Sequence, residues 1–323
     1  MIRWGVIGPG RIASEFAEDL RLLEDGELVA VASRSIDRAR SFADRFGVPN
    51  CYDDRDALLC DPRVDVVYVA TPHASHEADT LAALRAGKHV LCEKPFALNA
   101  RQATRMADEA RARGLFCMEA MWSRFLPAYR AMLEALHSGI IGEPLLVESD
   151  FGFRAPLDPA GRLFDLRLGG GALLDVGIYP VQLCMLVLGP VDRVIADGVV
   201  GDSGADEQVA AVLRHAGGRL GVVKAATRLE LACTARISGT EGAIELPSRA
   251  HCPQAYRVIT HSGVETVDCS FAGNGLRFEA AEVHRCIAAG LTESPIMPLD
   301  ATVALATVLD SIRRILGVGY PGE

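Results

Sequence analysis

Strand-like and helix-like segments alternate through the first 120 residues, and this alternation constrains the fold more than any other feature of the sequence. The strand-like runs are short, and they are β-branched or bounded by turn residues, as expected for strands buried on both faces. They cover residues 2–7, 28–32, 64–70, 89–92 and 115–118. Helical stretches lie between them at residues 12–23, 36–46, 76–86 and 100–113. Such alternation predicts a parallel, doubly wound sheet.

After residue 120 the strands follow one another with short turns between them. Runs with strand character cover residues 145–153, 191–200, 208–213, 219–228, 234–238, 243–246, 256–260 and 265–269. Helices are predicted at about 127–138, in the middle of 169–189, and at 276–289 and 299–316. Short turns favour antiparallel pairing. We therefore predict an α/β domain over residues 1–120, with the last helix packed back on it. An α+β domain, with helices on one face of an open, mainly antiparallel sheet, is predicted over residues 121–298.

Composition limits the class of protein and its partners. The 323 residues are 50% hydrophobic, which is enough for two ordinary domains. The formal charge of −9 disfavours nucleic acid or an anionic membrane as a partner, because both select basic surfaces. The nine cysteines include no C-x-x-C pair and no zinc-finger spacing, so reduced thiols, a cytoplasmic location and no structural metal are expected. Only Lys88, Lys94 and Lys224 are lysines, which makes each a candidate for a special role.

A glycine-rich turn follows the first predicted strand. Residues 8–13, Gly-Pro-Gly-Arg-Ile-Ala, fit the pattern G-x-G-x-x-A of dinucleotide-binding Rossmann domains. Gly8 permits the tight turn, and Gly10 lets the main chain approach a pyrophosphate. The main-chain N–H groups from Arg11 and Ile12 onward begin a helix and face the phosphates. The motif, in its β-α-β context, predicts a nicotinamide dinucleotide site.

The end of the second predicted strand bears on the choice of cofactor. NAD-binding domains place Asp or Glu there to bind the ribose 2′-hydroxyl. This sequence has Ser33 and Arg34, with Arg38 one turn further along. A hydroxyl and two guanidinium groups suit a 2′-phosphate, because they form charge-assisted hydrogen bonds with it. We therefore expect NADP, with NAD as the alternative.

Three further motifs complete a resemblance to a known family. Thr-Pro-x-x-x-His at 71–76, Glu-Lys-Pro at 93–95 and Gly-Gly-Gly-x-Leu-x-Asp-x-Gly-x-Tyr at 169–179 follow the glycine motif in that order. Over essentially its whole length, the chain resembles the Gfo/Idh/MocA oxidoreductases. Residues 118–127 and 151–180 resemble most the dimeric dihydrodiol dehydrogenases and the NADP-dependent D-xylose dehydrogenases of that family.

The resemblance implies three catalytic residues. Lys94 would lie beside the nicotinamide and the reacting hydroxyl, where an ammonium stabilises an alkoxide that forms as hydride leaves. Tyr179, which is histidine in many relatives, would serve as acid or base for the hydroxyl proton. Asp175 lies four residues earlier on the same helix face and would orient the lysine, the substrate or a water. From the residues alone, Asp175 as a helix cap and Tyr179 as a core residue is an equal alternative.

The remaining site residues follow from the same resemblance. His76 matches the family's histidine and would line the cofactor or help the helix to start. Further cofactor contacts are expected from Thr71, Pro72, His73, Glu93 and Arg162, the last of them at the phosphates. Aromatic and arginine side chains suit a polyol or diol substrate. Six such residues are expected to bind it, although each could instead pack at the domain junction. They are Trp122, Arg124, Phe125, Phe153 and Arg154, together with Tyr179.

The sequence thus predicts an NADP-dependent dehydrogenase acting on a secondary alcohol or hemiacetal of a sugar, polyol or cyclic trans-diol. One alternative with the same fold uses NAD transiently to cleave glycosidic bonds, with no net change in nicotinamide absorbance. Another is a non-catalytic sugar or nucleotide sensor, against which the presence of Lys94, Asp175 and Tyr179 argues. Relatives cover the open face of the second sheet with a second copy, so a homodimer is expected.

Overall fold

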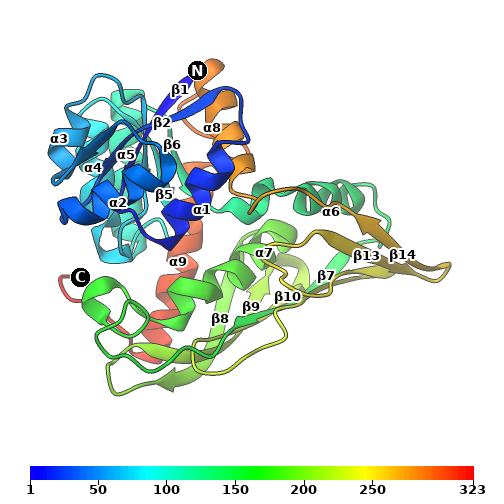
Figure 1. Ribbon diagram of the computed structural model, residues 1–323. Helices are drawn as coiled ribbons and strands as arrows, with labels where there is room; N and C mark the ends of the chain where they lie inside the picture. Colours follow the sequence, from blue (N-terminus) through cyan, green and yellow to red (C-terminus); the bar gives the residue numbers. More distant parts are fainter. The chain divides into compact units, whose positions relative to one another are not determined.

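The computed structural model describes residues 1–323, the whole chain, and the chain divides into two compact units (Figure 1). Unit 1 comprises residues 1–125 and 272–303, and unit 2 comprises residues 126–271 and 304–323. This division differs from the boundaries expected from the sequence, which assign residues 272–298 to the second domain. It also places most of the last helix, α9 (Leu299–Leu316), in unit 2.

The sheet of unit 1 is parallel throughout, and it confirms the predicted doubly wound Rossmann architecture. Its strand order is β3-β2-β1-β4-β5-β6, with every neighbouring pair parallel. The strands are β1 (Ile2–Ile7), β2 (Gly26–Ala32), β3 (Asn50–Tyr52), β4 (Val66–Val69), β5 (His89–Glu93) and β6 (Cys117–Ala120). The sequence does not predict β3, because three residues are too few to show a pattern.

Six helices surround this sheet and form two groups. Within each group the helices pack side by side. The first group is α1 (Arg11–Leu20), α2 (Ile36–Phe46) and α8 (Arg277–Ala288), and the second is α3 (Arg55–Leu59), α4 (His76–Arg85) and α5 (Ala100–Arg113). Helix α8 comes from the distant end of the chain, and a buried residue of α1 holds it. The Asp19 carboxylate accepts the N–H groups of Asn274 and Gly275, each at 2.7 Å, and that of Arg277 at 3.2 Å. Asp19 therefore caps the start of α8 from another helix, which explains why α8 belongs to unit 1.

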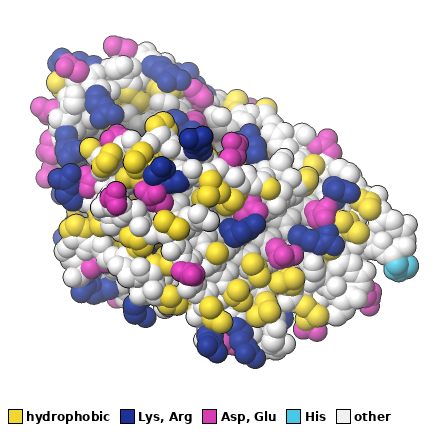
Figure 2. All heavy atoms as spheres, turned by 90° about the horizontal axis from the view of Figure 1, so that it is seen from below, with side chains coloured by type: hydrophobic (Ala, Val, Ile, Leu, Met, Phe, Trp, Pro, Cys, Tyr) yellow, Lys and Arg dark blue, Asp and Glu magenta, His cyan; other side chains and the backbone are white.

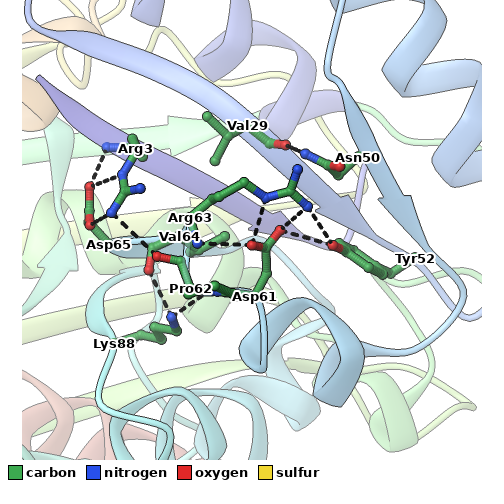
Figure 3. A network of polar contacts seen from close by, with 10 residues as sticks. All are labelled: Arg3, Val29, Asn50, Tyr52, Asp61, Pro62, Arg63, Val64, Asp65 and Lys88. Carbon is green, nitrogen blue, oxygen red and sulfur yellow. Dashed lines mark hydrogen bonds and ion pairs between the residues drawn. The ribbon is translucent and has the colours of Figure 1, made fainter.

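A polar network closes the loop between α3 and β4 (Figure 3). The ammonium of Lys88 donates to the carbonyl oxygens of Asp61 and Val64, each at 2.8 Å. The Asp61 carboxylate accepts from the side chain of Arg63 and the hydroxyl of Tyr52, each at 2.9 Å. The hydrogen bonds from Arg63 lower the pKa of Asp61 to about 2. Lys88 is thus a structural lysine.

The sheet of unit 2 is mainly antiparallel, as predicted. Its order is β14-β13-β12-β11-β7-β10-β9-β8, and only β7 and β10 pair in parallel. The strands are β7 (Pro144–Gly152), β8 (Val191–Val200), β9 (Asp206–His215), β10 (Leu220–Ala226), β11 (Ala235–Gly239), β12 (Gly242–Leu246), β13 (Ala255–Thr260) and β14 (Gly263–Asp268). Helix α7 (Ile178–Leu188) packs on β7 and β10, and α6 (Pro127–His137) contacts β13.

One stretch of unit 2, Leu166–Leu188, has the length and apolar composition of a membrane-spanning helix. In its most apolar window, 83% of the residues are buried inside the structure. That degree of burial is typical of a core helix, and here the helix covers one face of the sheet.

The opposite face of this sheet carries an apolar row. Gly221 lies against Cys184 of α7, so its neighbour Val222 lies on the other face. The strand register places Val212 and Ile195 beside Val222, and Ile195 is 56% exposed. Figure 2, which views the molecule from below, shows hydrophobic side chains in clusters among basic and acidic ones. This surface is the open face that the sequence predicts.

Candidate active site

The predicted cofactor residues of unit 1 follow the carboxyl ends of four neighbouring strands. Because the sheet is parallel, the loops after β1, β2, β4 and β5 lie at one edge of it. The strand order reverses between β1 and β4, and ligands bind at that edge in sheets of this kind. The structure therefore brings together the loops at residues 8–10, 33–38, 71–76 and 93–95.

The glycine turn after β1 has the shape that a pyrophosphate needs. Gly8 has a φ of +89°, and a Cβ atom there would lie 2.8 Å from the carbonyl oxygen of Ala70. Around Gly10 the space is open: a Cβ atom there would meet only the Gly8 carbonyl oxygen, at 4.0 Å. Helix α1 begins at Arg11, and no side chain caps it. The open glycine and the uncapped helix start together fit the pyrophosphate of a dinucleotide.

The loop after β2 carries basic groups and no carboxylate at its first two positions. Ser33 is half-buried, and its main-chain N–H donates to the carbonyl oxygen of Tyr52 at 3.1 Å. Arg34 and Arg38 are exposed, and neither forms an ion pair within the chain. The nearby Asp37 pairs with Arg40 at 3.9 Å. The two guanidinium groups thus remain available to an anionic ligand.

His76 joins two of the strand-end loops. It is fully buried, and its two ring nitrogens each lie 2.8 Å from a main-chain carbonyl oxygen, that of Pro95 and that of Thr71. Burial lowers the pKa of His76 from its ordinary value, against the opposing effect of the two carbonyl contacts. His73 begins the short turn before α4, and its ring lies 5.7 Å from that of His76. The structure therefore assigns His76 first to holding the loops, and leaves His73 the more accessible of the two.

Two buried carboxyl groups bind the main chain at and just after Lys94. Glu93, which ends β5, accepts the main-chain N–H of Lys94 at 3.2 Å and the hydroxyl of Tyr68. Glu119 of β6 accepts the N–H of Phe96 at 3.0 Å. Burial raises the pKa of Glu93 and raises that of Glu119 to about 7. These contacts fix the main chain on both sides of Lys94, whose side chain is half-buried at the sheet edge.

The segment after β6 forms a short 3₁₀ turn, η2 (Trp122–Phe125). Trp122 is half-buried, whereas Arg124 and Phe125 are each 6% exposed. The Arg124 guanidinium donates to the carbonyl oxygen of Ile296 at 3.2 Å, within unit 1. Of the three predicted substrate contacts here, Trp122 is the most accessible.

In unit 2 a π-helical turn, η4 (Leu173–Gly177), runs directly into α7, the helix that carries Tyr179. Asp175 lies in this turn and is 5% exposed. Arg162, which the resemblance places at the cofactor phosphates, donates to Asp175, with Nη1 at 2.9 Å from Oδ1. Phe153 is half-buried, and Arg154 is exposed in the loop after β7. Single π-helical turns are frequent at functional sites.

Tyr179 lies in an aromatic cluster that the sequence does not predict. Its ring centre is 5.7 Å from that of Phe151 and 5.5 Å from that of His251. Phe151 and His251 stack on each other at 4.1 Å with only 12° between their planes. His251 follows β12 in a loop without a recognisable motif, so no sequence signal identifies it. Phe151 shares the strand alternation of Phe153, which is the one signal available for it.

Comparison with known proteins identifies the family. The family model described as the oxidoreductase family with an NAD-binding Rossmann fold, GFO_IDH_MocA, matches residues 2–121. The model of the GFO/IDH/MocA C-terminal domain matches residues 129–245. The chain belongs to the Gfo/Idh/MocA family. It is therefore an oxidoreductase with a nicotinamide dinucleotide as its cofactor, as its glycine turn predicts.

Other Gfo/Idh/MocA proteins match this one over nearly their full length. The trans-1,2-dihydrobenzene-1,2-diol dehydrogenase of Danio rerio is 39% identical over 332 residues, 99% of this chain and 98% of that protein. The enzyme of the same name from Macaca fascicularis is 38% identical over 333 residues, 100% and 99% of the two chains. A 3-ketoreductase from Actinomadura kijaniata, solved with NADP and TDP-benzene, superposes with a TM-score of 0.86 at 29% identity and covers 97% of each chain. It has also been solved with a tyrosine replaced by phenylalanine and with a lysine replaced by alanine.

Proposed function

We propose that the chain is an NADP-preferring dehydrogenase for a secondary alcohol or hemiacetal of a sugar, polyol or cyclic trans-diol. The observation that carries this proposal is the placement of Lys94 at the same sheet edge as the open glycine turn after β1. The relatives named as diol dehydrogenases, together with the 3-ketoreductase, support a carbon bearing a hydroxyl or keto group as the reacting centre.

The cofactor site is proposed to use main-chain donors at one end and arginines at the other. Bound NADP supplies the hydride acceptor or donor. The turn from Gly8 to Gly10 and the first N–H groups of α1, at Arg11 and Ile12, hold the pyrophosphate. Ser33, Arg34 and Arg38 hold the 2′-phosphate. Thr71, Pro72, His73 and Glu93 line the adjacent loops, with His76 behind them.

The proton is proposed to pass through Tyr179, and Lys94 is proposed to stabilise the oxygen from which it leaves. A lysine ammonium lowers the free energy of an alkoxide because of its charge, and a phenol can accept or donate the hydroxyl proton. Asp175 fixes Arg162 through the ion pair described above and so shapes the surroundings of Tyr179. The lysine and tyrosine variants solved for the 3-ketoreductase support the choice of these residue types.

The substrate is proposed to contact partly accessible side chains that the family resemblance points to in each unit. Trp122, Phe153 and Arg154 supply ring faces and a guanidinium, which suit a polyhydroxylated ring. Arg124 and Phe125 are buried and support the turn that carries Trp122.

The function is tested by following absorbance at 340 nm while pentoses, hexoses, inositols and trans-dihydrodiols are offered with NADP near pH 9. We expect stoichiometric reduction of NADP with at least one of these substrates. If a glycosidic bond is cleaved with no net change in absorbance, the chain is a glycoside-cleaving enzyme of the same fold. If saturable binding occurs with neither reaction, the chain is a sensor.

Replacing Arg34 with aspartate is expected to weaken NADP binding and to increase the relative use of NAD. Removing one guanidinium–phosphate contact and adding a repulsive charge corresponds to roughly 2–3 kcal/mol, or about 30–150-fold in affinity. The measurement is the KM of each cofactor. Arg40→Asp makes the same charge change nearby, in α2, at a residue already paired with Asp37, and is expected to change either KM far less. Unchanged constants for both cofactors in Arg34→Asp would refute the assignment.

We further propose a cytoplasmic homodimer in which unit 1 binds the cofactor while unit 2 binds substrate and forms the interface. The nine cysteines are all free thiols, which supports a reducing compartment. The apolar row on the open face of unit 2 needs a covering surface. Light scattering at micromolar concentration is expected to give twice the 34.5 kDa of one chain.

The dimer prediction has a matched pair of variants. Ile195→Glu places a charge in the apolar row and is expected to yield monomers, whereas Leu22→Glu changes a 47% exposed leucine of unit 1 and is expected to remain dimeric. A wild-type chain that scatters as a monomer would rule the interface out.

A further inference from the structure

The glycine loop at residues 169–171 is enclosed by two buried side chains from distant parts of unit 2. Gly171 has a φ of +137°, and a Cβ atom there would lie 2.3 Å from Oδ1 of Asp206 and 3.3 Å from the hydroxyl oxygen of Tyr320. Asp206 belongs to β9 and is 0% exposed, and Tyr320 follows α9 and is 4% exposed. The glycine is therefore required here, because two polar side chains occupy the space that a larger residue would need.

Both side chains bind the main chain at the start of the segment that carries Asp175 and Tyr179. The Asp206 carboxylate accepts the N–H of Leu173, the first residue of η4, at 2.6 Å. The Tyr320 hydroxyl donates to the carbonyl oxygen of Gly170 at 2.9 Å. Because η4 continues without a break into α7, these two bonds fix the origin of the helix on which Tyr179 lies.

Tyr320 is itself held by a buried arginine. The Arg313 guanidinium lies 4.7 Å from the centre of the Tyr320 ring, a cation–π distance. Its Nη2 atom pairs with carboxylate oxygens of Asp310 and Glu323, each at 2.8 Å, and its side chain is 6% exposed. The residues after α9 therefore fold back on that helix, and Arg313 fixes the direction of the phenol. We refer to Asp206, Arg313 and Tyr320 as the clasp.

The clasp contains a feature that stability alone does not explain. Oδ1 of Asp206 is buried and has no hydrogen-bond partner, and the carboxyl group as a whole is removed from water. Leaving a buried acceptor unsatisfied costs about 1–3 kcal/mol. A residue that lowers stability in this way is expected where it holds a functional segment in place.

We propose that the clasp positions Asp175 and Tyr179, so that Asp206 and Tyr320 are positioning residues of the reaction. This inference rests on the roles proposed above for Asp175 and Tyr179. The clasp side chains act through the main chain: Leu173 and Gly170 are bound, and the helical turns that follow transmit their position. Misplacement of a reacting group by a fraction of an ångström is enough to slow the chemical step without changing cofactor binding.

The test compares two tyrosine-to-phenylalanine variants. Tyr320→Phe removes only the hydroxyl that binds Gly170, and Tyr52→Phe removes a hydroxyl of unit 1 that binds Asp61 at the same distance of 2.9 Å. We expect about a tenfold lower kcat in Tyr320→Phe, with an unchanged dissociation constant for NADPH measured by its fluorescence. We expect Tyr52→Phe to keep the wild-type kcat. Both assays are run at a temperature where circular dichroism shows the variants fully folded.

Two substitutions of Asp206 test whether its hydrogen bond to the main chain is what maintains kcat. Asp206→Asn keeps an oxygen that accepts the Leu173 N–H and is expected to retain kcat within about threefold, whereas Asp206→Leu loses the bond and is expected to lose at least tenfold. A wild-type kcat in Tyr320→Phe, or an equal loss in Tyr52→Phe, would overturn the clasp while leaving the proposed function intact.

Hydrogen exchange separates the clasp from the proposed function. If the wild-type chain transfers no hydride to or from any substrate tested, the proposed function fails. The clasp is then judged by amide exchange over residues 170–179, measured by mass spectrometry. Faster exchange there in Tyr320→Phe than in Tyr52→Phe supports the positioning role, and identical exchange overturns it.

Discussion

Lys94→Met and Tyr179→Phe are each expected to lower kcat by a factor of about 10²–10⁴. The first variant removes the charge proposed to stabilise an alkoxide, and the second removes the group proposed to take or give the hydroxyl proton. The Kd of NADPH is expected to stay nearly constant in Tyr179→Phe, because the phenol has no role at the phosphates. The double variant is expected to lose little more than the worse single variant, since both residues act on one proton.

Steady-state rates across a pH range provide the measurement. The rise of the oxidation rate toward basic pH is expected to flatten in Tyr179→Phe, which lacks the phenol proposed to transfer the proton. Tyr256→Phe serves as the control, because Tyr256 is a buried tyrosine of β13 with no proposed role. If Tyr179→Phe keeps both its turnover and its pH profile, Tyr179 is a packing residue and the proton passes elsewhere.

The sequence predicts the glycine turn and the start of α1 well, because both depend on local signals. A glycine turn, a strand end and a helix start lie within a few residues of one another, so their spacing alone places Gly8, Gly10 and the start of α1. The same reasoning holds for the parallel order of the sheet, since each β-α-β connection is short. Local patterns cannot predict that Asp19 caps α8, because the residues involved lie far apart in the chain.

In unit 2, too, local sequence patterns do not predict the contacts between residues that are distant in the chain. Asp175 and Tyr179 follow from a motif, but their surroundings do not. The hydrogen bond from Arg162 to Asp175, for example, is not predicted by the motif. His251 and the clasp residues have no flanking motif at all, and their contacts form only when a loop, a strand and the end of the chain fold together. A motif therefore suggests which side chains are functional, whereas tertiary packing decides what holds them.

Asp206→Asn is expected to raise the free energy of unfolding, and to raise it more at pH 8 than at pH 5.5. Burial raises the pKa of Asp206 from 3.8 to about 7 in the folded chain. As pH rises from 3.8 to 7, Asp206 loses its proton in the unfolded chain but keeps it in the folded chain, so the free energy of unfolding falls. Above pH 7 the carboxyl group is ionised in both states, and the loss of stability is constant. A pKa that is higher by about 3 units lowers the free energy of unfolding by about 4 kcal/mol at high pH. About 2 kcal/mol of that loss develops between pH 5.5 and 7. Asparagine has nearly the same shape and does not ionise.

Urea unfolding of wild type and variant at the two pH values measures this difference. Asp61→Asn provides a control of opposite sign, because hydrogen bonds from Arg63 lower the pKa of Asp61 to about 2 and its carboxylate is ionised at both pH values. That variant is expected to lose stability by the same amount at pH 5.5 and pH 8. A gain in Asp206→Asn that does not grow with pH would show that Asp206 is already ionised at pH 5.5. Arg313 would then have to compensate the buried charge, and the free energy that Asp206 costs the fold would be correspondingly smaller.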